Sequence, residues 1–219
     1  MRAFIMTPHA QTDLFDVRAP FAMDSDFTSA RRTMLDAHTW VEVVPNWITG
    51  SSVLFEALQS RVPWKQHYRE IFEQRVLEPR LTAEYRDIRD APDPALIEIT
   101  AVLSKHYGVG YDSLWLNWYR NGADSTGWHR DRFSCRLPEC VVPVLTLGAK
   151  RQFLLKPRSG GRSIGFTPGS GDLIVMGGRC QQDWVHSVPK TPGLLEPRIS
   201  LNFQSSEQAR RITRASTRV

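Results

Sequence analysis

The sequence predicts an α+β fold that is mainly β: a jelly roll, or double-stranded β-helix, with N-terminal flanking helices. Short runs rich in β-branched and aromatic residues follow one another after Tyr111, and Gly or Pro separates them. Runs of this size with regular turn residues are typical of a sandwich or jelly roll. Helical apolar spacing precedes these runs, and a length of 219 residues suits one domain.

The first half of the chain is expected to supply an arm, two helices and two strands. Residues 1–35 have no sustained apolar period, which predicts an extended or partly disordered arm. Residues 41–48 and 78–85 are predicted strands. Residues 51–60 begin with serine caps and continue with helical spacing. Residues 94–107 form a second predicted helix, whose inward positions are Leu96, Ile97, Ile99, Val102 and Leu103.

The second half carries the predicted jelly roll. Its seven expected strands are residues 114–120, 141–147, 152–156, 162–167, 172–176, 184–188 and 199–203. No internal repeat is present. We therefore expect one domain over residues 36–204, with its jelly-roll core from about residue 112, and a basic tail over residues 205–219.

Composition indicates a soluble protein with an anionic partner. The chain has 28 Lys and Arg against 23 Asp and Glu, a formal net charge of +5, and this excess favours a polyanion. The three cysteines form no CxxC pair and no even set, so we expect neither a disulfide framework nor a zinc site, and a reducing compartment. No apolar run approaches the length of a membrane span, so we expect an intracellular protein.

Three residues are candidate metal ligands. One residue separates His129 from Asp131, so both side chains leave the same face of an extended segment. His186 lies in a later predicted strand. Two imidazoles and one carboxylate form the facial triad that binds Fe(II) and leaves positions open. The alternative is a histidine that a carboxylate holds as structural packing.

A candidate anion site lies on two other strands. Alternation places Arg198 on the polar face of residues 197–203, where a buried guanidinium needs an acidic partner. A dicarboxylate ligand supplies that partner through a bidentate pair. Asn117 and Tyr119 share one strand face and can donate hydrogen bonds to the same anion. The alternatives are an internal Asp or Glu, or solvent at the strand end.

Five motifs occur in order along the chain and together suggest a family. They are Leu-Asn-Trp-Tyr-Arg-Asn-Gly (116–122), Gly-Trp-His-Arg-Asp (127–131), Gly-Asp-Leu-Ile-Val-Met-Gly-Gly (171–178), Asp-Trp-Val-His-Ser-Val-Pro-Lys (183–190) and Glu-Pro-Arg-Ile-Ser-Leu-Asn-Phe (196–203). This set resembles the AlkB family of Fe(II)- and 2-oxoglutarate-dependent dioxygenases. It is most similar to the branch of the eukaryotic nucleic-acid-repair homologues, over about residues 40–204.

The resemblance implies roles for six residues. His129, Asp131 and His186 would bind iron. Asn117 and Tyr119 would contact 2-oxoglutarate, and Arg198 would pair with its distal carboxylate. The implied reaction consumes O2 and demethylates bases of the 1-methyladenine and 3-methylcytosine type in DNA, or in RNA, with release of formaldehyde.

The resemblance also implies contacts to a base that has left the stack, because an atom inside a duplex cannot reach a buried iron. The segment Glu-Pro-Arg-Leu-Thr-Ala-Glu-Tyr (78–85) is similar to the family's strand beside the substrate and carries Arg80 and Tyr85. The base is expected to stack between His129 and an aromatic residue such as Trp64, Tyr85 or Trp128.

Three departures from the family pattern concern cosubstrate and substrate contacts. Gln204 stands where the family has a second Arg, and Ser200 where it has Asn, so we expect weaker or rearranged binding of 2-oxoglutarate. Phe133 lies near the usual place of an acidic residue; it can stack on a base but cannot accept from an exocyclic amine. The family's aromatic hairpin after Tyr85 is expected to be missing. We therefore expect loose base selectivity and a preference for single-stranded or unpaired nucleic acid.

The remaining expectations concern partners and place of action. Residues 11–15, Gln-Thr-Asp-Leu-Phe, resemble the peptide by which bacterial repair proteins dock on the sliding clamp; alternatively, Leu14 and Phe15 pack on their own domain. We expect a monomer that binds nucleic acid and no membrane, in the cytoplasm or nucleoid if bacterial and in the nucleus if eukaryotic. The competing functions are oxygenation of a protein side chain or small molecule, and a jelly-roll binding module without turnover.

Overall fold

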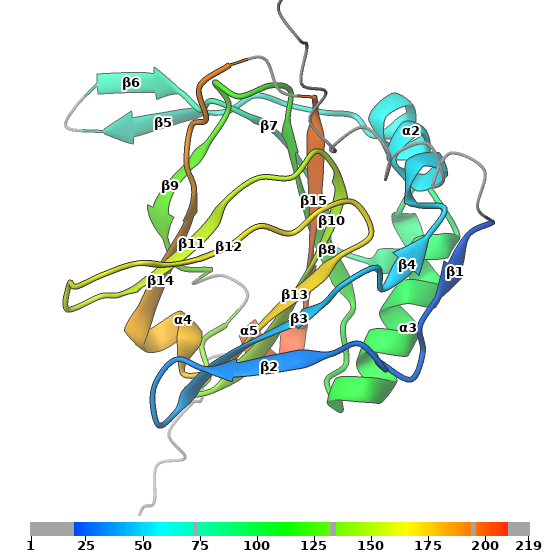
Figure 1. The fold of residues 1–219 in the computed structure, drawn as a ribbon. Coiled ribbons are helices and arrows are strands. Elements are labelled where there is room, and N and C mark those ends of the chain that lie inside the picture. The colour runs from blue at the N-terminus through cyan, green and yellow to red at the C-terminus, as the bar shows by residue number, and fades with distance from the viewer. Residues whose placement is uncertain (1–19, 72–73, 132–134, 194–195, 210–219) are drawn as a thin grey trace, which may run out of the picture.

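The computed structural model describes residues 20–71, 74–131, 135–193 and 196–209. Its main feature is a jelly roll in which two sheets face each other, with helices against the outside of the larger sheet (Figure 1). The expected docking peptide at residues 11–15 and Phe133 both lie outside these ranges.

The larger sheet has seven strands in the order β2-β3-β13-β10-β15-β8-β7. All its pairings are antiparallel. Their bounds are β2 Arg31–Met34, β3 Thr39–Val44, β13 Leu173–Gly178, β10 Cys140–Gly148, β15 Arg198–Gln204, β8 Ser113–Tyr119 and β7 Leu81–Tyr85.

The smaller sheet has four strands in the order β12-β11-β14-β9, also antiparallel. Their bounds are β12 Ile164–Phe166, β11 Phe153–Pro157, β14 Trp184–Val188 and β9 Thr126–His129. Two further pairs lie apart from the roll: β1 Ala22–Met23 with β4 Ile48–Thr49, and β5 Tyr68–Ile71 with β6 Gln74–Leu77. All seven strands predicted for the second half of the chain are confirmed.

The two longer helices, α2 and α3, cover the outer face of the larger sheet (Figure 1). The bounds of the helical elements are α2 Ser51–Arg61, α3 Ala95–Tyr107, the short turns α4 Cys180–Asp183 and α5 Ser206–Ala209, and the 3-10 turn η1 Ile88–Asp90. Leu54 and Leu58 of α2 and Ile99 and Leu103 of α3 join one apolar cluster with outward residues of β8, β10 and β15, such as Leu116. None of the helices in the described ranges is long and apolar enough to cross a membrane.

Strand alternation separates this outer core from a second core inside the roll. On β15 the outward residues Ile199, Leu201 and Phe203 belong to the helix-facing cluster. The inner core joins the two sheets, with Val144 of β10 and Phe153 and Leu155 of β11 among its members. The inward positions of β8 and β15 therefore carry the polar groups that the sequence singled out, including Arg198.

Two expectations about the ends of the domain change. Residues 20–35 belong to the predicted arm, yet they contain β1 and β2, and β2 pairs with β3 at the edge of the larger sheet. At the other end, α5 lies within the predicted tail. Its Gln208 side chain accepts from the backbone N–H of Val141 at 2.7 Å and donates to the carbonyl of the same residue at 3.0 Å.

The structure contains one disulfide that the cysteine pattern did not predict. Cys135 and Cys140 form a disulfide with a Cα–Cα distance of 6.0 Å, while Cys180 is a buried free cysteine. The odd number of cysteines argued against a framework of several bridges. It did not address one local bridge between cysteines five residues apart, which closes the segment after Asp131.

Candidate metal and cosubstrate site

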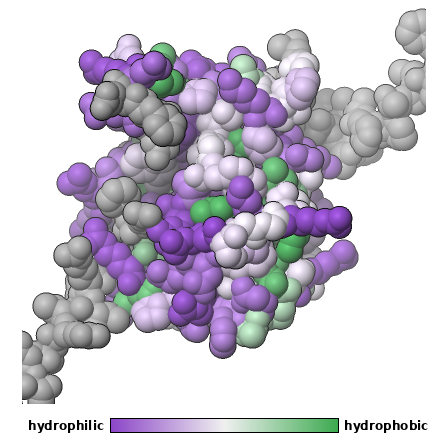
Figure 2. Space-filling model, turned by 90° about the vertical axis from the view of Figure 1, so that its left-hand side faces the viewer, coloured by the Kyte–Doolittle hydropathy of each residue, from purple (hydrophilic) through white to green (hydrophobic). Residues whose placement is uncertain are grey.

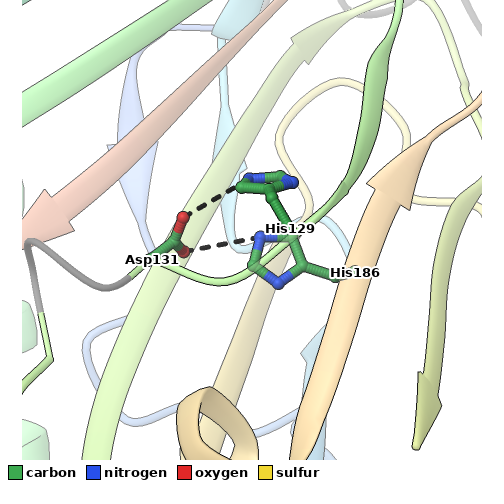
Figure 3. Close-up of side chains that lie close together, drawn as sticks. All are labelled: His129, Asp131 and His186. Atoms are coloured by element: carbon green, nitrogen blue, oxygen red, sulfur yellow. Dashed lines mark ion pairs between the residues drawn. The ribbon is translucent and has the colours of Figure 1, made fainter. Parts of the chain in front are cut away.

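The two candidate histidines lie side by side on neighbouring strands of the smaller sheet. His129 ends β9 and His186 lies in β14, and the two are register partners. Directly opposed residues on antiparallel strands point to the same side of a sheet. Their ring centroids are 4.2 Å apart, and both rings lie beside Asp131 (Figure 3).

Asp131 completes a compact group of three. Its Oδ1 lies 3.5 Å from Nε2 of His129, and its Oδ2 lies 3.5 Å from Nε2 of His186. One ligand atom from each residue falls within 4.8 Å of the others. The carbonyl of Gly127 lies 2.9 Å from Nδ1 of His129 and accepts a hydrogen bond from it, which leaves Nε2 as the ring nitrogen that can bind a metal.

The electrostatics favour the metal-binding protonation state for Asp131 and His186, whereas His129 must lose a proton when a metal binds. Burial alone would raise the pKa of Asp131, but the charge on His186 and hydrogen bonds from both histidines outweigh it, so the pKa lies well below its ordinary value. Burial lowers the pKa of His186. For His129, burial is outweighed by the hydrogen bond and charge of Asp131, which raise its pKa. An ionised carboxylate and a neutral imidazole are ligand forms.

The donor set fits Fe(II). Two imidazole nitrogens and one carboxylate form the facial triad of non-haem iron oxygenases, which leaves positions for substrate and oxygen. The fit rests on the three ligand atoms being close enough to share one ion. The sequence prediction that His129, Asp131 and His186 come together is thus met by the geometry.

Arg198 is the second feature of the site. It begins β15 and is 1% exposed, and its Nη2 donates to Oγ1 of Thr146 at 3.0 Å. Its Nε and Nη1 are buried without a hydrogen-bond partner among the described residues. No described Asp or Glu forms an ion pair with it, so the alternative of an internal acidic partner is not supported in these ranges. Burial lowers the pKa of Arg198 because it disfavours the charged guanidinium. A bound carboxylate would offset this cost of burying the charge.

Asn117 and Tyr119 lie on β8 across from β15, and Tyr119 is the register partner of Arg198. Oδ1 of Asn117 accepts from Nε of Arg80 at 2.9 Å and from Nε1 of Trp115 at 3.2 Å. Nδ2 of Asn117 donates to Oγ of Ser200 at 3.3 Å. Asn117 therefore retains one amide N–H for an anion, whereas Tyr119 shares its hydroxyl with Thr126 at 2.8 Å.

Among the predicted substrate residues, the structure brings Arg80 to the site. Its Nε reaches Asn117 and its Nη2 lies 3.2 Å from Oε2 of Glu78, so a carboxylate and an amide fix the guanidinium. Gln204 lies at the far end of β15, opposite Ser113. Six residues along a strand span roughly 20 Å, so Gln204 cannot share one carboxylate with Arg198.

Trp64 and Tyr85 are placed elsewhere, which corrects the expectation that they stack on a base beside His129. Both pack against the helix-facing cluster outside the roll. Tyr85 is the register partner of Leu114, whose side chain is in that cluster, and Trp64 packs on Trp118 with ring centroids 5.3 Å apart. The sequence shows which residues of β7 share a face, but it does not show which of the two faces points into the roll.

Trp128 lies on the rim of the site. It alternates with His129 on β9 and its side chain is 42% exposed. The ammonium of Lys156 lies 4.3 Å from the centroid of its ring. The smaller sheet thus presents an iron ligand on one face of β9 and an aromatic ring with a cation on the other.

Two buried residues escaped the sequence analysis. Arg151 is 2% exposed and donates to the carbonyls of Asn121, Asp124 and Pro189 at 2.8 to 3.0 Å, which ties the turn between β8 and β9 to the end of β14. The side-chain amide of Gln181 contacts both the backbone N–H and the carboxylate of Asp131. A single Arg or Gln has no spacing that marks such a role, so no pattern could have identified them.

Comparisons with known proteins agree with this site. A model of the 2OG-Fe(II) oxygenase superfamily matches residues 78–212. The chain is 32% identical over 173 residues to the alpha-ketoglutarate-dependent dioxygenase alkB homolog 3 of Bos taurus, covering 69% of this chain and 60% of that protein. It is 29% identical over 193 residues to the DNA oxidative demethylase ALKBH2 of Arabidopsis thaliana, covering 70% and 62%.

The fold also has a counterpart among solved structures. The structure of OsALKBH1 superposes with a TM-score of 0.57 over 80% of this chain and all of that one, at 12% identity, which is a likeness of fold alone. The chain spans about 60% of the length of the curated relatives it matches.

Proposed function

The chain belongs to the 2OG-Fe(II) oxygenase superfamily, and from that membership we propose that it is a dioxygenase that removes methyl groups from alkylated bases in nucleic acid. The carrying observation is the combination of the triad with Arg198, whose two unsatisfied guanidinium nitrogens lie inside the same roll. The relatives named above are demethylase and dioxygenase homologues, which supports the substrate class.

Each residue of the site has a proposed role in binding either iron or 2-oxoglutarate. Nε2 of His129, a carboxylate oxygen of Asp131 and Nε2 of His186 would hold iron. Arg198 would bind the distal carboxylate of 2-oxoglutarate, with help from the free amide N–H of Asn117 and the hydroxyl of Tyr119. When bound, iron and 2-oxoglutarate supply the oxidation of the N-methyl group by O2, after which formaldehyde leaves.

Burial of the site serves the same reaction. His186 and Arg198 are 5% and 1% exposed, whereas the side chains of His129 and Asp131 are 31% and 20% exposed, so the roll shields the cosubstrate end of the site and leaves its iron end partly open to a substrate. Arg80 remains oriented by Glu78 and Asn117 toward this interior and is the described side chain best placed to donate to an acceptor atom on a base. Among the predicted stacking residues that the structure describes, His129 faces the site, whereas Trp128 lies on the opposite face of β9.

A basic rim lies next to the site and fits a phosphate backbone. We define it as Arg130, Lys156, Arg158 and Arg162. The guanidinium groups of Arg130 and Arg158 both donate to the carbonyl of Gln182, at 3.3 and 2.8 Å, which places two cations together. Between β11 and β12, Gly160 and Gly161 have φ values of 98° and 112°, a turn that glycine favours. The face of the molecule in Figure 2 is largely hydrophilic, with scattered apolar residues.

The proposal is tested with methylated oligonucleotides. Purified protein with Fe(II), 2-oxoglutarate and O2 should release formaldehyde from both 1-methyladenine and 3-methylcytosine, and faster from single strands than from duplexes, because unstacking costs least there. Asp131→Ala is the inactive control. No formaldehyde from any methylated oligonucleotide, with succinate formed in the presence of another substrate class, would establish the alternative of a protein or small-molecule oxygenase.

Selectivity and partners complete the proposal. Discrimination between the two bases should stay below about a hundredfold, since that ratio requires nearly 3 kcal/mol of specific contacts to the base edge. We further propose a monomer that acts where nucleic acid is repaired, in the nucleoid or the nucleus. Docking of residues 11–15 on a sliding clamp remains a proposal, which a pull-down with and without Phe15→Ala would test.

A further inference from the structure

Asp131 is the iron ligand with the least support from the sheet. β9 ends at His129, so backbone pairing with β14 fixes the two histidines but not the carboxylate two residues later. A ligand beyond the end of a strand needs another anchor to stay between two imidazoles. The described contacts of Asp131 identify one, on the segment that leads into β14.

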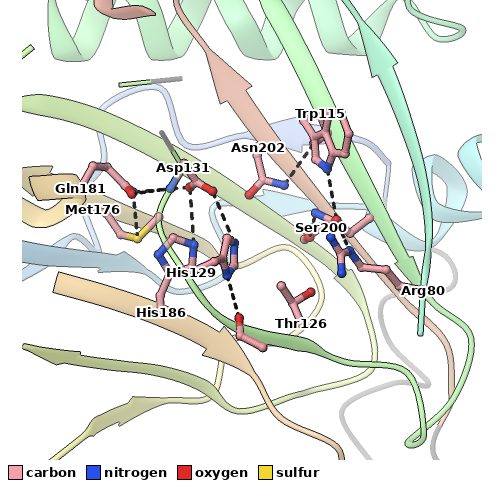
Figure 4. Close-up of polar contacts among 12 residues, drawn as sticks. Arg80, Trp115, Thr126, His129, Asp131, Met176, Gln181, His186, Ser200 and Asn202 are labelled. Carbon is pink, nitrogen blue, oxygen red and sulfur yellow. Dashed lines mark hydrogen bonds and ion pairs between the residues drawn. The ribbon is translucent and has the colours of Figure 1, made fainter. Parts of the chain in front are cut away.

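Gln181 lies in the short turn α4 and is 3% exposed. Its Oε1 accepts a hydrogen bond from the backbone N–H of Asp131 at 2.8 Å. Its Nε2 lies 3.4 Å from Oδ2 of Asp131 and 3.5 Å from the sulfur of Met176 on β13. One buried amide therefore contacts both the main chain and the carboxylate of the same residue (Figure 4).

The chemistry fixes which way this amide faces. The backbone N–H of Asp131 can only donate, so it requires the carbonyl oxygen of Gln181. The amino group then faces two acceptors, the carboxylate of Asp131 and the sulfur of Met176. A flipped amide would set two donors against each other and leave the carboxylate facing an oxygen. All three described contacts are satisfied in one orientation only.

We propose that Gln181 is a positioning residue that holds Asp131 in the geometry of an iron ligand. Hydrogen-bond partners of metal ligands orient those ligands and tune their basicity, and their loss typically costs metal affinity. Gln181 lies five residues before His186, and α4 continues directly into β14. The hydrogen bonds of Gln181 therefore also tie Asp131 to the strand that carries the third ligand. This inference deepens the proposed function and rests on metal binding by the same triad.

The neighbouring glutamine offers a matched control. Gln182 is the next residue of α4, and its side chain donates to the carbonyl of Leu137 and to the sulfur of Cys135 rather than to Asp131. Replacement by methionine keeps the length of either side chain and removes its hydrogen bonds. Gln181→Met therefore removes the hydrogen bonds to Asp131, whereas Gln182→Met leaves them in place.

The test is an anaerobic titration of the full chain with Co(II) alone, followed by the visible absorption of the bound ion. Wild type should bind one Co(II), and Asp131→Ala should lose this site. Gln181→Met should weaken binding by roughly 10- to 100-fold and alter the absorption bands, since the carboxylate changes position. Gln182→Met should stay within about twofold. Thermal unfolding of each metal-free variant checks that it folds.

Two results separate the inference from the proposed function. If wild type binds Co(II) in an Asp131-dependent way, and Gln181→Met binds it with unchanged affinity and spectrum, the positioning role is overturned and the triad stands. If wild type has no Asp131-dependent site, the proposed function itself fails. Should Gln181→Met not fold, Gln181→Asn keeps the amide but is one methylene too short to reach both groups; binding as tight as wild type in that variant would also overturn the role.

Discussion

Arg198 carries a charge inside the jelly roll, where a guanidinium without an anionic partner is costly. Its surroundings supply a threonine hydroxyl and the ring of Tyr119, whose centroid lies 5.3 Å from the guanidinium carbon, but no described carboxylate. The two unsatisfied nitrogens are therefore the residue-level feature that most directly calls for a dicarboxylate.

Arg198→Ala should raise the dissociation constant for 2-oxoglutarate by about 100-fold, because loss of one partner of a buried charge pair costs about 3 kcal/mol. Arg198→Lys should have a smaller effect, since it keeps the charge but not the fork of two nitrogens. Equilibrium binding of 2-oxoglutarate to the Mn(II) form measures both. An unchanged constant for Arg198→Ala would make Arg198 a structural residue.

Asp124 should contribute stability that depends on pH. Burial opposes its ionisation, but hydrogen bonds from Arg120 outweigh burial and lower its pKa from 3.8. A lowered pKa means that the contribution is fully present above pH 3.8 and is lost as the pH falls through the lower, folded-state pKa. Asp124→Asn should cost roughly 1–3 kcal/mol at pH 7 and less near pH 3. Urea unfolding at both values measures this, and a cost that is equal at the two would contradict it.

The number of thiols that can be alkylated tests the disulfide between Cys135 and Cys140. Burial raises the pKa of the Cys180 thiol to about 12, and Cys135 and Cys140 are bonded to each other. Native oxidised protein should therefore resist iodoacetamide at neutral pH, and unfolding without a reductant should expose one reactive thiol. Mass spectrometry counts the adducts. Three alkylated cysteines without prior reduction would show that the bridge is absent.

At this scale the sequence predicted the site through a set of motifs rather than through single residues. His129, Asp131, His186 and Arg198 each allowed a structural alternative, and their roles were implied by the five ordered motifs that resemble the AlkB family. Trp64 and Tyr85 were misplaced, because an aromatic side chain suits a core as well as a base. Gln181 was missed, because its role depends on one backbone N–H that comes near it only in the folded chain.

Among the elements, the hairpin of β11 and β12 carries most of the basic rim. Arg158 and Arg162 are exposed on it, and Lys156 covers the ring of Trp128. β11 pairs with β12 along one edge and with β14, the strand of the iron ligand His186, along the other. Phosphates bound to the hairpin would therefore lie one strand away from this ligand.

Neutralising Lys156, Arg158 and Arg162 together should flatten the salt dependence of single-stranded oligonucleotide binding. Each lost phosphate contact lowers the slope of log K against log salt by about 0.7, so the triple alanine variant should lose about 2. Arg31, Arg61 and Lys105, exposed on β2, α2 and α3, provide a matched control triple. An equal slope in the rim variant and the control would exclude this hairpin as a phosphate contact.

Elements were predicted where the apolar period is long enough to define them. The strands β10, β11, β13, β14 and β15 and the helices α2 and α3 have such periods. β9 has only four residues, Thr-Gly-Trp-His, and the described residues of the hairpin of β5 and β6 belong to neither core. These strands are stabilised by backbone pairing with a neighbouring strand, and their own residues do not reveal that partner.

For the whole molecule, two cores perform different tasks. The helix-facing core holds the larger sheet flat against α2 and α3, and the inner core closes the two sheets on each other. The two histidines of the triad lie on the smaller sheet and Arg198 on the larger one, so the site exists only when the roll is closed. The central claim is that this closed roll binds Fe(II) and 2-oxoglutarate together.

Anaerobic titration with Fe(II) and 2-oxoglutarate tests that claim most directly, because a visible charge-transfer band requires both on one metal centre. The account predicts a band that saturates at one Fe(II) and one 2-oxoglutarate per chain, is absent in Asp131→Ala and His186→Ala, and needs more 2-oxoglutarate in Arg198→Ala. No band in the wild-type protein, or an undiminished band in Asp131→Ala, would contradict it.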